Sequence, residues 1–328
     1  MAKGIGIDVG FGFTKAVSKS SNFIFPSLIG EAREIRFKSG YSEQDKVSNL
    51  DLQVDGDKYF IGEKAQRQSR HIINTLDKDR NVSNESDSLF FTALGLLSDS
   101  RAAAFDLVTG LPVDEYTEFK DKLKTKLTGV HDFTLNGENK KIMVKNCKVI
   151  PQPFGTLFNQ LLTERGEIEN KKLAALKIGV ADIGFRTSDF AAADSMEFID
   201  RSSGSVNVGL STAHREIARV INDRFGINKK PLELEEEIRA GTIKVKGIEY
   251  DITDTINQAF ELTAREIVSE MNNIWPEKWS FDEIIITGGG GVALYDYISK
   301  QVDNCSLLDN GQLANANGYL KLVQRTWG

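Results

Sequence analysis

The stretch IGIDVGFGFTKAV (residues 5–17) places one carboxylate, Asp8, at the end of an apolar run and directly before glycine-rich sequence. Glycine lets the backbone turn sharply and approach an anion, so the N–H groups of Gly10 to Gly12 can form a concave phosphate cradle. Lys15 can add a positive charge for phosphate oxygens. Asp8 would repel phosphate unless a cation lies between them, and carboxylates can hold Mg²⁺ through its bound waters. The stretch therefore predicts a strand, a phosphate-binding turn and a magnesium site.

A second copy of this pattern, KIGVADIGFRTSD (residues 177–189), lies 174 residues later (182 minus 8). Asp182-Ile183-Gly184-Phe185 matches residues 8–11, and Thr187 falls near Thr14. Internal repetition at this distance predicts a duplicated domain, with the two loops facing each other across a cleft and clamping a magnesium-bound polyphosphate. The alternative is that each loop is an ordinary tight turn with a solvated aspartate, since Asp and Gly are common turn residues.

Length and composition restrict the class of protein. The chain has 328 residues, which favours two domains of ordinary size. Its 47 acidic and 41 basic residues give a net charge of −6, so no direct nucleic-acid partner is expected. Cys147 and Cys305 lie in no metal-ligand spacing. The first residues resemble no signal peptide and no run is long enough to span a bilayer, which predicts a cytoplasmic protein without a membrane partner.

Periodicity predicts alternating strands and helices in the first half. A strand meander opens the chain, followed by a hairpin with Asp55-Gly56 as its turn, a helix over 88–97 and a strand over 105–112. Apolar residues three or four apart predict a helix over 116–127. The charged segment 163–172 is the best domain boundary. We therefore expect one domain of residues 1–165 plus 315–328 and a second of residues 166–314.

The second half repeats this logic. The sequence predicts a helix over 211–225 closed by Gly226, a hairpin over 243–252, and a long helix from Thr253 to Trp275 that Pro276 ends. His71, His131 and His214 have no catalytic or metal spacing and are expected to be surface or hydrogen-bonded side chains.

Four glycines, Gly288, Gly289, Gly290 and Gly291, follow a predicted strand over 281–287. With Ala293 and Asp309 they fit a dinucleotide-binding fingerprint. Only 19 residues follow Asp309 (328 minus 309), too few for the strands and helices that such a fold needs, and no Walker A pattern exists. The glycines can instead lie against adenosine and an α-phosphate, or form a loop with no ligand.

Five segments, in this order and spacing, resemble the nucleotide-binding segments of the actin, Hsp70 and sugar-kinase superfamily. They are DVGFGFTK (8–15), VIPQPFGTLF (149–158), VADIGFRTSDF (180–190), ITGGGGVAL (286–294) and NANGYLKL (315–322). The short length and the phrase VTGLPVDEY look most like bacterial or archaeal actin-like ATPases of the plasmid-segregating ParM type. The resemblance implies an actin-like α/β fold, in which two duplicated domains, each with a mixed five-stranded sheet, flank a nucleotide cleft.

The resemblance also implies roles for single residues. Asp8 and Asp182 would hold Mg²⁺ through water, Gln152 would orient the attacking water, and Gly288 to Gly291 would contact adenosine and the α-phosphate of ATP or ADP, with GTP left as an alternative. Glu236 and Arg239 are weaker candidates for the ribose and base. The two phosphate loops would comprise Gly10, Phe11, Gly12, Phe13, Thr14 and Lys15 on one side, and Gly184, Phe185, Arg186 and Thr187 on the other.

Two departures from the family pattern matter. Phe185 and Arg186 stand where the second loop is often richer in glycine, which puts its fine geometry in doubt. Gln152 stands where bacterial members commonly have Glu. An amide cannot act as a general base and can only align water, which predicts slow hydrolysis.

The resemblance implies an ATP-hydrolysing protein that polymerises head to tail, for plasmid or other DNA segregation or another cytoskeletal role, and that reaches DNA through a DNA-binding adaptor. One alternative is a small-molecule kinase of the sugar-kinase type, although no acid accompanies Gln152 as a catalytic base. A non-polymerising actin-like adaptor is the other alternative.

Overall fold

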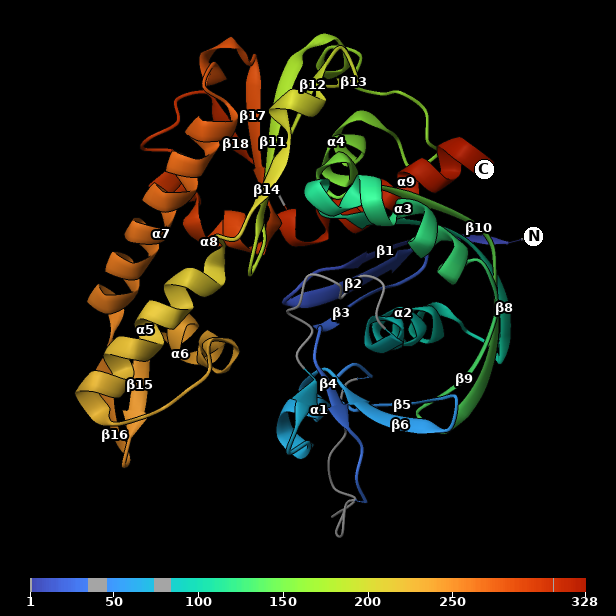
Figure 1. Cartoon of the computed structure of the whole chain (residues 1–328), viewed down its shortest axis with the longest axis horizontal. Helices are drawn as coiled ribbons and strands as arrows, with labels where there is room; N and C mark the ends of the chain where they lie inside the picture. The colour runs from blue at the N-terminus through green and yellow to red at the C-terminus, as the bar shows by residue number, and fades with distance from the viewer. Residues whose placement is uncertain (1, 35–45, 74–83, 309) are drawn as a thin grey trace. The chain divides into compact units, whose positions relative to one another are not determined.

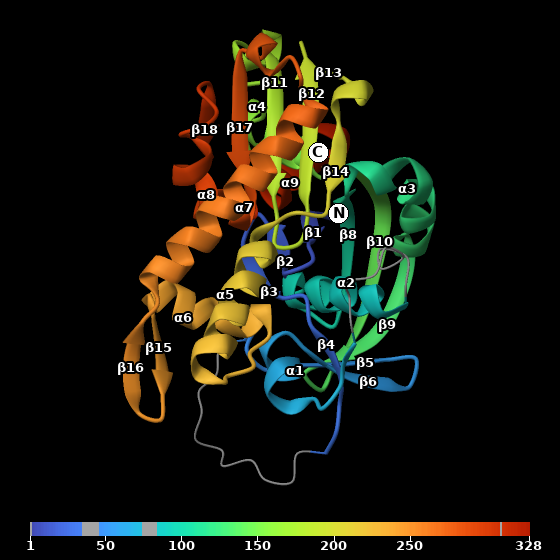
Figure 2. The same ribbon diagram turned by 60° about the vertical axis from the view of Figure 1, so that its left-hand side comes forward.

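Two compact units make up the chain (Figures 1 and 2). Unit 1 contains residues 1–173 and 313–328, and unit 2 contains residues 174–312. The structure, a computed structural model, describes residues 2–34, 46–73, 84–308 and 310–328. Within them no helix is both long and apolar enough to cross a bilayer.

Unit 1 is built on one mixed sheet with ten described strands. Along the chain they are β1 (Lys3–Val9), β2 (Phe13–Ser18), β3 (Asn22–Pro26), β4 (Ile29–Glu31), β5 (Leu50–Val54), β6 (Asp57–Ile61), β7 (Ile72–Ile73), β8 (Ala102–Leu111), β9 (Gly129–Leu135) and β10 (Glu138–Pro151). Their order in the sheet is β3-β2-β1-β8-β10-β9-β5-β6-β4-β7. β1 pairs antiparallel with β2 and parallel with β8, which pairs parallel with β10.

Unit 2 repeats the first five positions of this sheet. Its strands are β11 (Lys177–Ile183), β12 (Ser188–Asp194), β13 (Glu197–Phe198), β14 (Gly204–Val206), β17 (Glu283–Thr287) and β18 (Cys305–Leu307). The order β13-β12-β11-β17-β18 has the same antiparallel and parallel pairings as β3-β2-β1-β8-β10, and β14 adds to β12. The duplication predicted from the two aspartate loops is therefore present in the strand topology.

The expected five-stranded mixed sheet recurs in both units, and unit 1 extends it by five further strands. The extension is possible because β10 is fourteen residues long and passes through an irregularity between Val144 and Asn146. The part before this irregularity pairs with β9, which in turn pairs with β5. A bulge of this kind bends a strand and increases its twist, which lets the sheet curl away from its five-stranded part.

Helices cover these sheets. Unit 1 contains α1 (Glu63–Gln68), α2 (Asn84–Leu97), α3 (Val113–Leu127), α4 (Pro153–Leu161) and α9 (Ala314–Trp327), and unit 2 contains α5 (Leu210–Phe225), α6 (Glu235–Ala240), α7 (Thr253–Ile274) and α8 (Gly288–Ile298). Short 3₁₀ turns are η2 (Leu173–Ala175), η3 (Asp200–Ser202), η4 (Pro231–Leu234), η5 (Lys278–Ser280) and η6 (Gly311–Leu313). In unit 1, the core with α2 and α3 lies on one face of the sheet, and a smaller cluster with α4 and α9 lies on the other. Figure 1 shows α2 inside the curve of the sheet.

Several predicted elements are confirmed. Asp55 and Gly56 turn the β5–β6 hairpin with positive φ angles of 51° and 91°, as their turn chemistry requires. The predicted apolar face of α3 is buried, with Leu123 and Leu127 each 1% exposed. Gly226, in the left-handed conformation, ends α5. In unit 2, α7 and α8 cover one face of the sheet, and a second core forms between α5, α7 and the β15–β16 hairpin (Thr242–Val245 and Ile248–Asp251).

Residues 166–173, which the sequence analysis placed in the second domain, pack with unit 1. Gly166 has a φ of 80°, and its carbonyl oxygen accepts a hydrogen bond of 3.1 Å from Nη1 of Arg325 on α9. A β-bridge joins Leu162 to Ile168. The segment therefore folds back on α9 before the chain enters unit 2.

Candidate functional site

The first predicted phosphate loop joins β1 to β2 in unit 1. Asp8, only 3% exposed, lies opposite Lys15 in the two-strand register, and Nζ of Lys15 donates to Oδ2 of Asp8 at 2.9 Å. The N–H of Gly10 closes the turn on the carbonyl oxygen of Phe13 at 3.1 Å. A methyl group on Gly10 would lie 3.0 Å from that oxygen and 3.1 Å from Nζ of Lys15. The structure thus brings Asp8, Gly10 and Lys15 together, and glycine keeps the space between them open.

Gln152 reaches the same carboxylate from another element. It precedes α4, where Pro153 occupies the first helical position, and it is 9% exposed. Its side-chain nitrogen Nε2 donates to Oδ1 of Asp8 at 3.2 Å, although 144 residues separate the two in sequence. The two oxygens of Asp8 are therefore bound by Gln152 and by Lys15. The predicted water-orienting residue and the predicted metal-binding carboxylate lie at one site.

The second predicted loop, between β11 and β12 in unit 2, has the same turn. The N–H of Gly184 donates to the carbonyl oxygen of Thr187 at 2.9 Å, as Gly10 does to Phe13. The register places Ile183 opposite Ser188, as it places Val9 opposite Thr14. The structural equivalent of Thr14 is therefore Ser188, one residue after the expected Thr187.

Ser188 and Thr14 have the same structural role in their units. Both hydroxyl groups are fully buried. Thr14 Oγ1 lies 2.9 Å from Ser27 Oγ, and Ser188 Oγ donates to Val208 O at 2.8 Å. Each hydroxyl group thus ties the second strand of its loop to the segment that follows.

Asp189 is a candidate that the sequence analysis missed. It follows Asp182 by seven residues, as Lys15 follows Asp8, and it lies opposite Asp182 in the register. Asp189 is 3% exposed and accepts a hydrogen bond from Ser205 Oγ. Comparing the register of the two repeats, in addition to their motifs, would have identified it. Two neighbouring carboxylates are hard oxygen ligands of the kind that Mg²⁺ prefers.

Two helix N-termini support the second loop. The N–H groups of Leu210 and Ser211, at the start of α5, donate to Gly184 O at 3.1 Å and to Phe185 O at 2.6 Å. A methyl group on Gly290, in α8, would lie 2.7 Å from Gly184 O. Helix N-termini carry partial positive charge and attract phosphate groups. The loop is thus held where two such ends converge.

The four glycines form the first turn of α8, so they are not a loop, and their predicted contact with a nucleotide stays a prediction. Gly288 has a φ of 84°, and a methyl group there would overlap Ile183 O and approach Oδ1 of Asp182. A methyl group on Gly289 would meet no atom of the described residues within 4 Å. The rival fingerprint shares this strand-to-helix geometry, but its acidic residue, Asp309, lies outside the described residues.

Glu236 and Arg239 both lie on α6 and are exposed. Nη2 of Arg239 donates to Oε1 of Glu235 at 3.2 Å, one turn earlier in the helix. α6 packs against η4 and β15. The expected contact of Glu236 and Arg239 with the ribose and base stays a prediction.

His214, on α5, stands directly behind the second loop. Its ring meets that of Phe185 edge to face, with centroids 5.4 Å apart, and its Nδ1 lies 2.9 Å from Pro231 O. Burial lowers the pKa of His214 below its ordinary value, and the hydrogen bond to Pro231 partly opposes this shift. The prediction of a hydrogen-bonded histidine is confirmed for His214.

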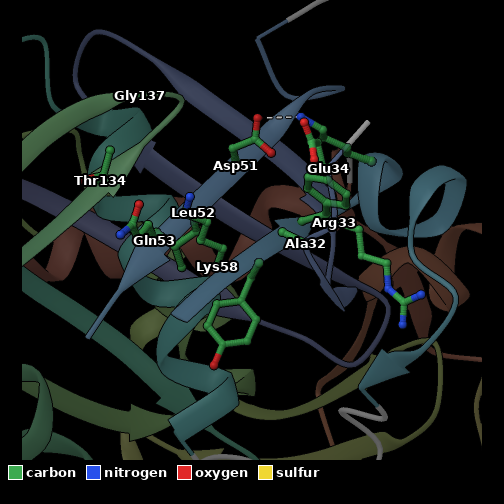
Figure 3. Close-up of a pocket in the computed structure, with 12 residues that line it drawn as sticks. Ala32, Arg33, Glu34, Asp51, Leu52, Gln53, Lys58, Thr134 and Gly137 are labelled. Carbon is green, nitrogen blue, oxygen red and sulfur yellow. Dashed lines mark hydrogen bonds and ion pairs between the residues drawn. The ribbon is translucent and has the colours of Figure 1, made fainter. Parts of the chain in front are cut away.

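A separate cavity of about 610 Å³ lies in unit 1, on the extension of the sheet (Figure 3). Lys64 and Asp51 on its wall form an ion pair of 2.5 Å, and Arg33, Gln53 and Thr134 also line it. None of the predicted site residues lines this cavity. Across the described residues, no three His, Cys, Asp or Glu side chains form a cluster able to hold a metal ion by themselves.

Comparisons with known proteins give one consistent result. The model of the N-terminal domain of actin-like proteins matches residues 6–155, and that of the C-terminal domain of the archaeal MreB-like actin homologue matches residues 180–300. Curated protein sequences give no significant match.

Solved structures agree over nearly the whole chain. A 15-stranded ParM filament from Clostridium botulinum has 26% identity and a TM-score of 0.83, covering 99% of this chain and 100% of its own. A non-polymerisable quadruple mutant of pCBH ParM has 25% identity and a TM-score of 0.80, covering 98% and 99%. An archaeal actin homologue in complex with ADP, at 21% identity, shares the fold with a TM-score of 0.82 and coverage of 99% and 100%. The predicted actin-like fold is confirmed, and the chain is an actin-like protein whose structure is similar to those of ParM proteins.

Proposed function

We propose that this chain binds ATP with Mg²⁺, hydrolyses it slowly and polymerises head to tail into filaments that segregate plasmid or other DNA. The observation that carries the proposal is the repeated turn. In each unit a strand ends in an aspartate, and a glycine N–H closes the next turn on a carbonyl oxygen, at 3.1 Å for Gly10 and 2.9 Å for Gly184. A related fold that crystallised with ADP supports nucleotide binding.

The proposal gives separate roles to Asp8 and its neighbours in unit 1 and to the two carboxylates of unit 2. Nζ of Lys15 forms an ion pair with Asp8, and it could instead contact phosphate oxygens of a bound nucleotide. Asp8, Asp182 and Asp189 supply carboxylate oxygens that can hold Mg²⁺ through its waters, and bound Mg²⁺ would neutralise charge on the phosphates. The amide nitrogen of Gln152 faces Asp8, so its carbonyl oxygen can accept a hydrogen bond from the attacking water. An amide cannot take up a proton at neutral pH, which agrees with slow turnover.

The residues of unit 2 would contribute a second set of nucleotide contacts. The start of α5 fixes the loop that contains Gly184 and Arg186, and no described atom lies within 4 Å of the place that a methyl group on Gly289 of α8 would take. Adenosine and the α-phosphate can therefore approach the backbone there without meeting a side chain. Glu236 and Arg239 are proposed for the ribose and base, and GTP stays an alternative to ATP.

Self-association is proposed from the relatives. The ParM of 26% identity forms a filament, and a head-to-tail contact that does not close generates an open polymer. ATP would favour the polymerising conformer, and hydrolysis would weaken it, because a ligand shifts an equilibrium only by its differential affinity for two states. The net charge of −6 favours attachment to DNA through a DNA-binding adaptor. A cytoplasmic location is part of the same proposal.

Light scattering during ATP addition tests the proposal. The wild-type chain with ATP and Mg²⁺ should scatter above a critical protein concentration, and omission of Mg²⁺ should abolish the signal. Electron microscopy of the same sample should show filaments. A chain that never scatters but transfers phosphate from ATP to a sugar would support the kinase alternative. A chain that binds ATP and does neither would support the non-polymerising adaptor.

A further inference from the structure

The first turn of α4 is attached to the C-terminal helix α9 by a buried polar contact. Oδ1 of Asn315 accepts two hydrogen bonds from Thr156, one of 3.0 Å from its backbone N–H and one of 2.9 Å from its hydroxyl group. Thr156 is fully buried and Asn315 is 6% exposed. In such surroundings, an acceptor that has lost its donor costs about 1–3 kcal/mol, so this contact favours one arrangement of the two helices.

The same two helices also touch through their backbones. A methyl group on Gly318 of α9 would overlap the carbonyl oxygen of Gly155 on α4, and one on Gly155 would lie 2.7 Å from Cα of Asn315. Close-packed backbones leave no room for sliding, because protein interiors have few voids. The first turn of α4 therefore moves with α9 or breaks the contacts to Asn315.

Gln152 directly precedes this turn. Its carbonyl oxygen accepts hydrogen bonds from Gly155 N–H at 2.9 Å and from the hydroxyl group of Tyr319 at 3.4 Å. Its own N–H donates to Leu111 O at 2.8 Å. The backbone of Gln152 is thus fixed by β8, by α4 and by α9, while its side chain alone reaches Asp8.

From these contacts we infer that Asn315 and Thr156 are positioning residues for Gln152. Their hydrogen bonds fix the position of the first turn of α4 relative to α9, and this position sets where the Gln152 amide lies for its proposed contact with the attacking water. The inference rests on the proposed role of Gln152 in hydrolysis. Misplacing a catalytic group by about 1 Å can reduce a rate by about 10²-fold.

The test compares Thr156→Val with Thr156→Ser in ATPase assays of the full chain with Mg²⁺. Val has the shape of Thr without the hydroxyl group, whereas Ser keeps it. We expect Thr156→Val to lower kcat by roughly tenfold with KM unchanged, and Thr156→Ser to stay within about twofold of wild type. Thr92→Val is the matched control, because Thr92 is also fully buried and its hydroxyl group bonds a backbone oxygen, at 2.7 Å, on α2.

Combination with Gln152→Ala separates positioning from general destabilisation. If Thr156 acts through Gln152, Thr156→Val should have no further effect on kcat in a Gln152→Ala background. An equal loss in both backgrounds, or a loss as large in Thr92→Val, would overturn the inference. A wild-type chain that does not hydrolyse ATP would overturn the proposed function and this inference together. Normal hydrolysis by Thr156→Val would overturn the inference alone.

Discussion

The side-chain nitrogen of Gln152 lies 3.2 Å from Oδ1 of Asp8, which turns the amide nitrogen toward the carboxylate and leaves the amide oxygen for water. Replacing Gln152 with Ala removes this oxygen and should lower ATP hydrolysis by about 10- to 100-fold. Nucleotide binding should persist, because Asp8, Lys15 and both glycine loops are unchanged in this variant. Polymers should therefore last longer after ATP is exhausted, which a scattering decay curve measures.

The control for Gln152→Ala is Gln160→Ala, which shortens a glutamine within α4. Hydrolysis by Gln160→Ala should stay at the wild-type rate. Equal rates in wild type and both variants would contradict the assignment of Gln152.

The acidic pair on β11 and β12 leads to a second prediction. Asp182 and Asp189 lie opposite each other, so the loss of either charge should weaken the site for a hydrated cation. We expect Asp182→Asn and Asp189→Asn each to raise the Mg²⁺ concentration that gives half-maximal hydrolysis by on the order of tenfold. Titration of ATPase activity with Mg²⁺ measures this value. Asp194→Asn, at the exposed end of β12, should leave it unchanged.

Much of the fold follows from local signals in the sequence. The turns at Asp55-Gly56 and Lys246-Gly247 need positive φ angles, and Gly226 closes a helix in the left-handed conformation. Such signals act within a few residues and can be read directly. The short strands β4 and β7 carry no comparable signal, because two or three residues hold no periodicity. β4 pairs with both β6 and β7, so the place of these two short strands in the sheet depends on residues outside their own segments.

The residues of the candidate site also differ in how far the local sequence identifies them. Asp8, Gly10 and Lys15 lie close together in sequence, on one turn and the two strands beside it, so a short motif identifies them. The contact between Thr156 and Asn315 joins positions 159 residues apart, and nothing local to either residue indicates it. Asp189 is intermediate, since it becomes visible only when the two repeats are compared in strand register.

Packing between α4 and α9 leads to a third prediction. A methyl group on Gly318 has no space beside Gly155 O, so Gly318→Ala must push the helices apart. Overpacking of this kind typically costs about 1–3 kcal/mol in the free energy of unfolding. Denaturant unfolding should show the loss. Ala316→Gly, which removes a buried methyl group from the same helix, gives a comparison that destabilises without separating the helices. Only Gly318→Ala should also lower kcat through Gln152.

A fourth prediction concerns pH. Burial lowers the pKa of His214 from its ordinary value of 6.5, against a smaller opposing effect of the hydrogen bond to Pro231. The unfolded chain therefore binds a proton at a higher pH than the folded chain does. The neutral ring of His214 contributes its full stability above pH 6.5. This contribution is lost as the pH falls from 6.5 toward the lowered pKa of His214 in the folded chain. The loss can reach about 1.4 kcal/mol for each pH unit in that window.

Denaturant unfolding at pH 7.5 and pH 5.5 measures this effect. The wild-type free energy of unfolding should fall between these values by more than that of His214→Gln, in which the titrating ring is absent. Exposed carboxyl groups whose pKa is lowered, such as Glu216, titrate below their ordinary value of 4.5 and so contribute little in this window. His71→Gln, at an exposed position, controls for the substitution itself. If the free energy of unfolding of His214→Gln falls as much between pH 7.5 and pH 5.5 as that of wild type, groups other than His214 cause the effect.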